Sequence, residues 1–193
     1  MNPHRRVRSG YILLEVLVTI IILAIGLLGL AGFQARATVA ESEGYQRAQA
    51  LILAQDMVDR IYANRVNAAT YVQSDIGVPA TVTSCTALTG KAKDVCEWGN
   101  LLIGASEAVG GSNVGTLLGG RGCITAGGAN EYFVTVAWQG LVSTASAGNA
   151  GAAACGFNQY KDQSGATNDA MRRVVAMRVV IATLSNIVIP PPP

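Results

Sequence analysis

The longest hydrophobic pattern in the chain is an apolar run over residues 11–33, YILLEVLVTIIILAIGLLGLAGF. Between Arg8 and Arg36 the only acid or base is Glu15, near the start of this run. A helix rises about 1.5 Å per residue, so the run is long enough to cross about 30 Å of hydrocarbon. The pattern therefore predicts one membrane-spanning helix.

The segment that follows, residues 34–64, is predicted to continue the same helix. It has no proline and one glycine, Gly44, and it is rich in Ala, Gln, Glu and Arg, which favour helix. Apolar side chains recur at i, i+3, i+7, i+10 and i+11, namely Leu51, Ala54, Val58, Ile61 and Tyr62. This stripe indicates an amphipathic helix, and we expect it to be buried against a sheet.

Two later segments alternate with the period of two that is typical of strands. In residues 132–139, one face carries Tyr132, Val134, Val136 and Trp138, and we expect Trp138 in the core. In residues 173–184, one face carries Val175, Met177, Val179 and Ile181, while Arg178 lies on the other. A long helix followed by such strands predicts the α+β class, with the second half of the helix packed on an antiparallel sheet.

The remaining segments are rich in small and polar residues. Residues 68–130 predict a long connecting region, whose most flexible part is GASEAVGGSNVGTLLGGRGC. Residues 143–154 predict a second loop. IVIPPPP predicts a short strand that becomes an extended tail, since proline cannot donate to a sheet. The glycine-rich region lacks the Gly-x4-Gly-Lys-Ser/Thr arrangement, so a phosphate-binding loop is not supported.

The formal net charge of +2 depends on the first ten positions, which contain Arg5, Arg6 and Arg8. Of the 14 Lys and Arg residues, 11 remain beyond these three, and they face 12 Asp and Glu. The remaining bases are scattered, so nucleic-acid binding is not expected. Because three bases precede the apolar run, the positive-inside rule predicts a cytoplasmic N-terminus and places everything after Phe33 across the membrane.

Four cysteines, Cys85, Cys96, Cys123 and Cys155, all lie beyond the apolar run. An even number in an exported domain predicts two disulfides with three possible connectivities. Chain order favours Cys85 with Cys96 and Cys123 with Cys155. A metal site is disfavoured, because no spacing is Cys-x2-Cys and no histidine lies nearby.

Catalysis is not expected either. The one histidine, His4, lies in the basic segment before the apolar run, so neither a Ser-His-Asp nor a Cys-His arrangement can be built in the exported part. The carboxylate pair Asp56 and Asp59 is interpreted as the solvated face of the helix. We expect no catalytic residue, no metal, no cofactor and no enzyme activity.

Glu15 carries the strongest functional signal. A charged side chain at the centre of a membrane helix costs about 2.5 to 3.5 kcal/mol, and less near an interface, so Glu15 is expected to have a cationic partner. Cleavage between Gly10 and Tyr11 would create an amine four residues before Glu15, on the same helical face. The equivalent amine of a neighbouring subunit would serve as well. The alternative interpretation is an incidental carboxylate at the membrane interface.

An ordinary secretory signal peptide is the alternative for the whole apolar run. Ala35-Arg36-Ala37 resembles its small-residue cleavage site. However, the run is longer than the 7 to 15 or so residues usual for such a signal, and it contains a carboxylate.

The segment SGYILLEVLVTIIILAIGLLGLAGFQ resembles the class III signal of type IV prepilins. The shared features are a basic leader ending in glycine, a hydrophobic first mature residue and glutamate at the fifth mature position. The continuation into an Ala- and Gln-rich helix is similar to the minor pilins of the PilV type. The resemblance covers about the first sixty residues, and the later AWQG strand with spaced cysteines fits more loosely. Tyr11 departs from the phenylalanine or methionine that is commoner in the family.

This resemblance implies the type IV pilin fold and a sequence of processing steps. A prepilin peptidase would cut after Gly10 and methylate the amine of Tyr11, and Glu15 would pair with the methylated amine of an adjoining subunit. It also implies a single-pass protein of the bacterial inner membrane with a periplasmic head, which then enters a surface pilus. The implied partners are other minor pilins, the major pilin and the inner-membrane assembly platform.

We therefore expect four regions: a leader over residues 1–10, a membrane and filament-core helix over 11–33, its amphipathic continuation over 34–64, and a disulfide-bonded head over 65–193. The expected function is that of a minor pilin that helps initiate assembly or forms part of the tip. The alternatives are a pseudopilin of a type II secretion or competence system and a membrane-tethered periplasmic binding module.

Gly26, Gly29 and Gly32 form a ridge of small residues within the apolar run. Such a ridge permits close helix approach, and it also weakens the helix, because each glycine costs about 0.5 to 1 kcal/mol relative to alanine. We expect local unwinding here in an assembled filament.

Overall fold

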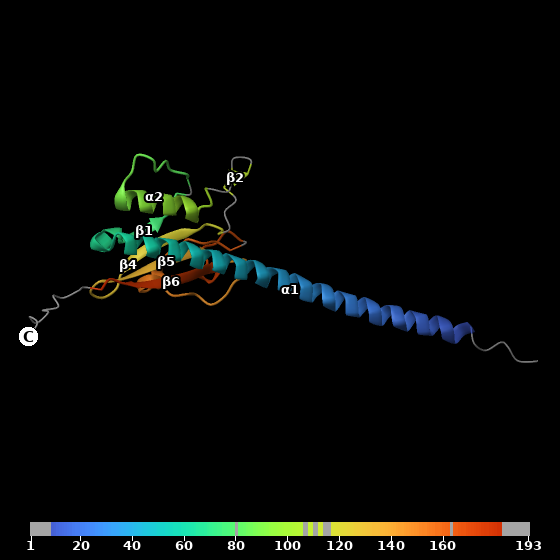
Figure 1. Ribbon diagram of the computed structural model, residues 1–193. Coiled ribbons are helices and arrows are strands. Elements are labelled where there is room, and N and C mark those ends of the chain that lie inside the picture. Colours follow the sequence, from blue (N-terminus) through green and yellow to red (C-terminus); the bar gives the residue numbers. More distant parts are fainter. Residues whose placement is uncertain are drawn as a thin grey trace, which may run out of the picture. The chain divides into compact units, whose positions relative to one another are not determined.

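The computed structural model describes residues 9–79, 81–105, 108–109, 112–113, 117–162 and 164–182. The chain forms two compact units, Met1–Ser42 and Glu43–Pro193. A single long helix, α1 (Ser9–Ala63), supplies the described part of the first unit and continues into the second, which we call the head (Figure 1). The predicted long helix is therefore confirmed.

In the first unit, α1 exposes its apolar side chains. Sixteen large apolar residues from Tyr11 to Phe33 are 43–77% exposed. The hydroxyl of Thr19 donates to the backbone oxygen of Val16 at 2.8 Å, so this polar group is satisfied within the helix. Among the described residues, α1 is the one helix that is long and apolar enough to cross a membrane.

The head contains a four-stranded antiparallel sheet in the order β1-β4-β5-β6. Its strands are β1 (Gln73–Ile76), β4 (Arg121–Ala126), β5 (Glu131–Gln139) and β6 (Arg172–Val180). β5 and β6 confirm the two predicted strands, and they pair in register with Tyr132 opposite Val179 and Val136 opposite Val175. Together, the helix and the sheet have the predicted α+β architecture.

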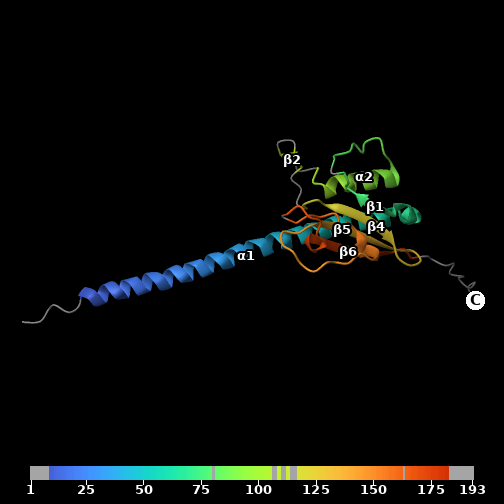
Figure 2. The ribbon, with the colours of Figure 1, turned by 180° about the vertical axis from the view of Figure 1, so that it is seen from behind.

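The shorter elements of the head connect these strands. They are the helix α2 (Gly90–Leu102), the 3-10 helices η1 (Arg65–Tyr71), η2 (Gly151–Ala154) and η3 (Asp169–Met171), and a separate two-stranded pair, β2 (Ala108–Val109) with β3 (Ser112–Asn113). Figures 1 and 2 show the part of α1 that belongs to the head lying along one face of the sheet, with α2 beside it.

The main core lies between the sheet, α1 and α2. The helix buries Ala50, Ala54, Met57, Val58 and Ile61 in it. Of the predicted stripe, Ala54, Val58 and Ile61 are therefore buried as expected.

The predictions for Leu51 and Tyr62 were wrong, because each side chain is 43% exposed. Each residue advances about 100° around a helix, so these two positions point roughly a quarter turn away from the centre of the buried face. Ala50 and Met57 occupy the places at the contact instead.

The prediction of one long connecting region over residues 68–130 was also wrong, because β1, α2 and β4 lie within it. The reason is close packing. A Cβ atom on Gly122 in β4 would lie 2.2 Å from Cζ3 of Trp98 and 2.7 Å from Cδ1 of Leu102, both from α2. The missing side chain leaves room for a helix against the strand, so this small residue belongs to the core. Part of the segment predicted to be most flexible lies outside the described residues.

A second, smaller core covers the opposite face of the sheet. It contains Cys123, Ala137, Cys155, Tyr160 and Met171. β5 is therefore covered on both faces: Val134 and Val136 face the main core, and Ala137 faces the second.

Two disulfides join elements of the head. Cys85 bonds to Cys96 in α2, and Cys123 in β4 bonds to Cys155 at the end of η2. This is the pairing that chain order favours. The predicted loop over residues 143–154 contains η2, and the IVIPPPP tail lies outside the described residues.

Candidate docking segment and head pocket

The candidate docking segment is the N-terminal part of α1. Ser9 and Gly10 are already helical, and Tyr11 and Glu15 are exposed on the helix. Since they are four residues apart, the backbone nitrogen of Tyr11 and the carboxylate of Glu15 lie on the same side of the helix. Within the described part of the chain, Glu15 has no ion-pair partner.

The chemistry of this segment is that of a lone acid on an apolar surface. The Thr19 hydroxyl is satisfied within its own helix, whereas the Glu15 carboxylate has no cationic partner among the described residues. In lipid or in a bundle of helices, a carboxylate is retained at low cost only when a cation and hydrogen-bond donors compensate it.

The glycine ridge of α1 is open in the single chain. Among the described residues, no atom beyond the neighbouring backbone of the helix itself lies within 4 Å of a Cβ built on Gly26, Gly29 or Gly32, and the helix is continuous through all three. The surface is therefore free to contact another helix closely, and the expected unwinding concerns only the filament.

At the start of the head, Glu43 ties α1 to the loop after β5. Its Oε1 atom accepts hydrogen bonds from the backbone N–H groups of Leu141 at 3.0 Å and Val142 at 3.3 Å, and from Arg173 Nη2 at 2.9 Å. The same Arg173 nitrogen also donates to the backbone oxygen of Val142 at 2.6 Å. The carboxylate of Glu43 is thus already neutralised by the fold.

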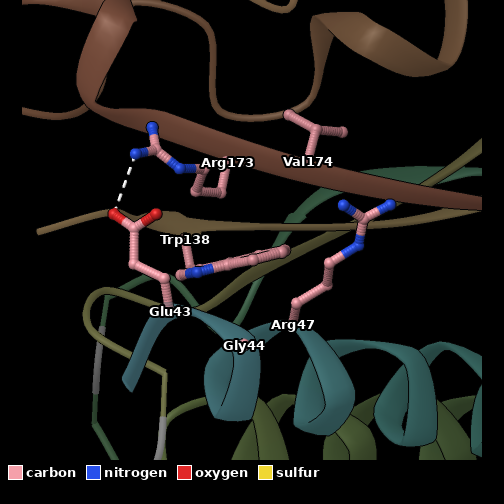
Figure 3. Close-up of a pocket in the computed structure, with 6 residues that line it drawn as sticks. All are labelled: Glu43, Gly44, Arg47, Trp138, Arg173 and Val174. Atoms are coloured by element: carbon pink, nitrogen blue, oxygen red, sulfur yellow. Dashed lines mark hydrogen bonds and ion pairs between the residues drawn. The ribbon is translucent and has the colours of Figure 1, made fainter. Parts of the chain in front are cut away.

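A pocket of about 290 Å³ lies beside this ion pair, entirely within the head. It is lined by Glu43, Gly44, Arg47, Trp138, Arg173 and Val174 (Figure 3). The indole of Trp138 lies between Glu43 and Arg47, and its ring nitrogen is at the Glu43 end. That nitrogen is buried and has no hydrogen-bond partner among the described residues.

At the other end of the head, Arg60 attaches α1 to α2. Its guanidinium group contacts Asp56 at 2.9 Å, Glu97 at 2.7 Å and Asp94 at 3.5 Å. The hydrogen bond from Arg60 lowers the pKa of the Glu97 carboxyl group. Burial and a hydrogen bond to Asp94 raise the pKa of the Tyr71 hydroxyl group.

The loop before β6 is organised by Arg172, whose side chain is fully buried. Its Nε atom donates to Asp169 Oδ1 at 2.6 Å, and its other nitrogens donate to the backbone oxygens of Gly148, Ala153 and Cys155. The hydrogen bond from Arg172 holds the pKa of the Asp169 carboxyl group below its usual value. This network explains how a segment of small residues has a defined shape.

Sequence reasoning found Glu15 but missed Glu43, Arg172 and Arg173. The available signal was a pair of arginines opening an otherwise apolar strand, since charges at such positions are expected to be paired when they are buried. Among the described residues, no group of three or more His, Cys, Asp or Glu side chains is placed to hold a metal ion.

The long helix and the antiparallel sheet form an α+β architecture that is consistent with the type IV pilin fold. A model of the family described as the Tt1218-like type IV pilins matches residues 32–98, from α1 to near the end of α2. This match supports a relationship to the type IV pilin family, whose members are in general structural subunits. It begins beyond Gly10, Tyr11 and Glu15, so it is separate from the resemblance carried by the N-terminal segment. Neither the curated proteins nor the solved structures include a significant match to this chain.

Proposed function

We propose that this chain is a minor pilin of the PilV type, which resides in the inner membrane and then enters a type IV pilus. Three features support this: the α+β fold, the family match over residues 32–98, and the leader-like segment that ends at Gly10. Residues 11–33 hold the subunit in the membrane before assembly, and the disulfide-bonded head faces the periplasm.

The observation that carries the proposal is the exposed apolar surface of α1 with Glu15 within it. In a soluble protein, sixteen exposed large apolar side chains on one helix would be severely unfavourable. Lipid satisfies them before assembly, and neighbouring helices of a filament satisfy them afterwards. Of these two environments, the filament also offers a partner for the carboxylate.

In this proposal, a prepilin peptidase cuts after Gly10 and methylates the new amine of Tyr11. Glu15 then pairs with the amine of an adjoining subunit, and this pair defines the axial position of the incoming helix. The assembly platform extracts the subunit from the membrane, and its neighbours are other minor pilins and the major pilin. As a low-abundance subunit, it helps initiate assembly or forms part of the tip.

N-terminal sequencing of the mature protein tests the processing step, with Tyr11 expected as the first residue. A chain that retains Met1, or that begins near Thr38, would refute the assignment.

Docking is tested with Glu15→Ala, which should insert into the membrane and be processed, yet enter filaments poorly. Glu41→Ala is the matched control, because Glu41 is also an exposed glutamate of α1 in the first unit, and it should leave incorporation unchanged. Wild-type piliation by the Glu15→Ala protein would contradict the proposed pair.

Two alternatives are separated by further readouts. A deletion strain that keeps its pili and twitching motility but loses exoprotein secretion would indicate a pseudopilin. A chain that is never cleaved after Gly10 would indicate a membrane-tethered binding module.

A further inference from the structure

The pocket lined by Glu43, Arg47, Trp138 and Arg173 has a positive charge excess. It contains two guanidinium groups and one carboxylate. Glu43 is already occupied by Arg173 and by two backbone N–H groups. Arg47 is exposed and has no ion pair within the described part of the chain, so its charge is the one available to a ligand.

Trp138 provides a second, independent observation at this pocket. Its side chain is 3% exposed, and its indole N–H has no partner among the described residues. The other tryptophan, Trp98, shows the usual arrangement, because its Nε1 atom donates to the backbone oxygen of Leu53 at 2.7 Å. Buried indole N–H groups generally have an acceptor, so the Trp138 N–H is an unsatisfied donor in a side chain that lines the pocket.

The positions of these two donors restrict the ligand. Figure 3 shows the Trp138 ring nitrogen at the Glu43 end of the pocket and the Arg47 guanidinium group at the opposite end. A ligand that satisfies both carries an acceptor at each end, one of which is anionic. An acidic residue has this form, with a side-chain carboxylate for Arg47 and a backbone carbonyl for the indole. A volume of about 290 Å³ accommodates one such residue.

We propose that this pocket receives an acidic residue of an adjoining pilin subunit, with its carboxylate on Arg47. This inference rests on the proposed function for the source of the residue, and on the pocket alone for its chemistry. A cationic ligand would meet the excess positive charge, and a purely apolar one would leave both donors unpaired.

The chemistry is tested by ¹⁵N NMR on the full chain in detergent micelles, where the two tryptophans give two indole signals. Trp138→Phe assigns them. The probe is N-acetyl-glutamic acid amide, and the matched neutral probe is N-acetyl-glutamine amide. We expect the acidic probe to shift the Trp138 signal saturably, leave the Trp98 signal in place, and bind at least tenfold more tightly than the neutral probe.

Arg47→Gln should weaken binding of the acidic probe at least tenfold. Arg65→Gln, which changes another exposed arginine without an ion pair among the described residues, should not. The proposal is overturned if no saturable shift occurs, if both probes bind equally, or if Arg47→Gln binds like the wild type.

The source of the residue is tested in filaments. If the occupant belongs to another subunit, Arg47→Gln should be processed normally but be incorporated several-fold less than Arg65→Gln. Normal incorporation of a variant that has lost probe binding would overturn the intersubunit assignment. Probe binding needs neither cleavage nor assembly, so its failure is distinct from a failure of cleavage after Gly10.

Discussion

Gly122 tests the close contact between α2 and the sheet. A methyl group at this position would lie 2.2 Å from Cζ3 and 2.3 Å from Cη2 of Trp98. That ring cannot move away easily, because it is fully buried and its Nε1 atom donates a hydrogen bond to the backbone oxygen of Leu53 in α1. Overpacking of a tight core costs about 1 to 3 kcal/mol, and this overlap with a fixed ring belongs at the upper end. Replacing glycine also makes the unfolded chain less flexible, and this offsets about 0.5 to 1 kcal/mol of the loss in stability.

We therefore expect Gly122→Ala to lower the free energy of unfolding of the head by about 2 kcal/mol, which corresponds to roughly 4 to 8 °C in Tm for a unit of this size. The assay is thermal and urea unfolding in micelles with the disulfides intact. Gly44→Ala is the matched control, because its added Cβ would meet no described atom within 4 Å apart from the neighbouring backbone of its own helix. It should stabilise the helix by about 0.5 to 1 kcal/mol. The reasoning fails if the two variants change stability in the same direction.

Arg172→Met should lower the free energy of unfolding by about 3 to 5 kcal/mol, because Asp169 would keep a charge without its buried partner. Urea unfolding measures this, and a loss below about 1 kcal/mol would contradict a structural role for the pair. We also expect acid sensitivity, because the pKa of Asp169 is lower in the folded state than in the unfolded state. The contribution of Asp169 to the free energy of unfolding is therefore complete above its unfolded pKa of about 3.9, and it is lost as the pH falls through the folded-state pKa. Arg172→Met should lack this acid component. At high pH, burial raises the pKa of Tyr160 to about 12. The folded state therefore loses about 2 to 3 kcal/mol as the pH rises from about 10 to 12, and Tyr160→Phe should remove that loss in alkaline unfolding curves.

The parts of the fold that sequence predicted are those in which one physical requirement determines the pattern. The long helix follows from unbroken apolar and helix-favouring residues, and β5 and β6 follow from alternation on a half-buried surface. Trp138 is in the core as expected. These patterns are local, so they need no knowledge of what packs against them.

The predictions were wrong where the position of a residue in the fold depends on side chains that are distant in the sequence. Glycine is typical of loops, but Gly122 lies in a strand because its lack of a side chain makes room for Trp98, which is 24 positions earlier in the chain. The centre of the predicted helical face was turned by about 50° from the buried one, because leucine and tyrosine are more apolar than alanine, whereas a close helix–sheet contact selects small side chains such as Ala50.

The candidate site was predictable to a similar degree. Glu15 is visible as a single acid in an apolar run, and its proposed partner is a group that only processing creates. Glu43 and Arg173 lie 130 positions apart, and no local pattern connects them. Their pairing, and the pocket beside it, follow from how the loop after β5 folds back on the helix.

The location of the head's core determines where a water-soluble fragment can begin. Ala50, Ala54, Met57, Val58 and Ile61 are contributed by the same helix that carries the exposed apolar residues of the first unit. A truncation placed at the end of α1 would remove five interior side chains and leave an open sheet. Cutting the chain just before Glu43 keeps all five together with the ion pair to Arg173, so that is where a crystallisable fragment of the head should start.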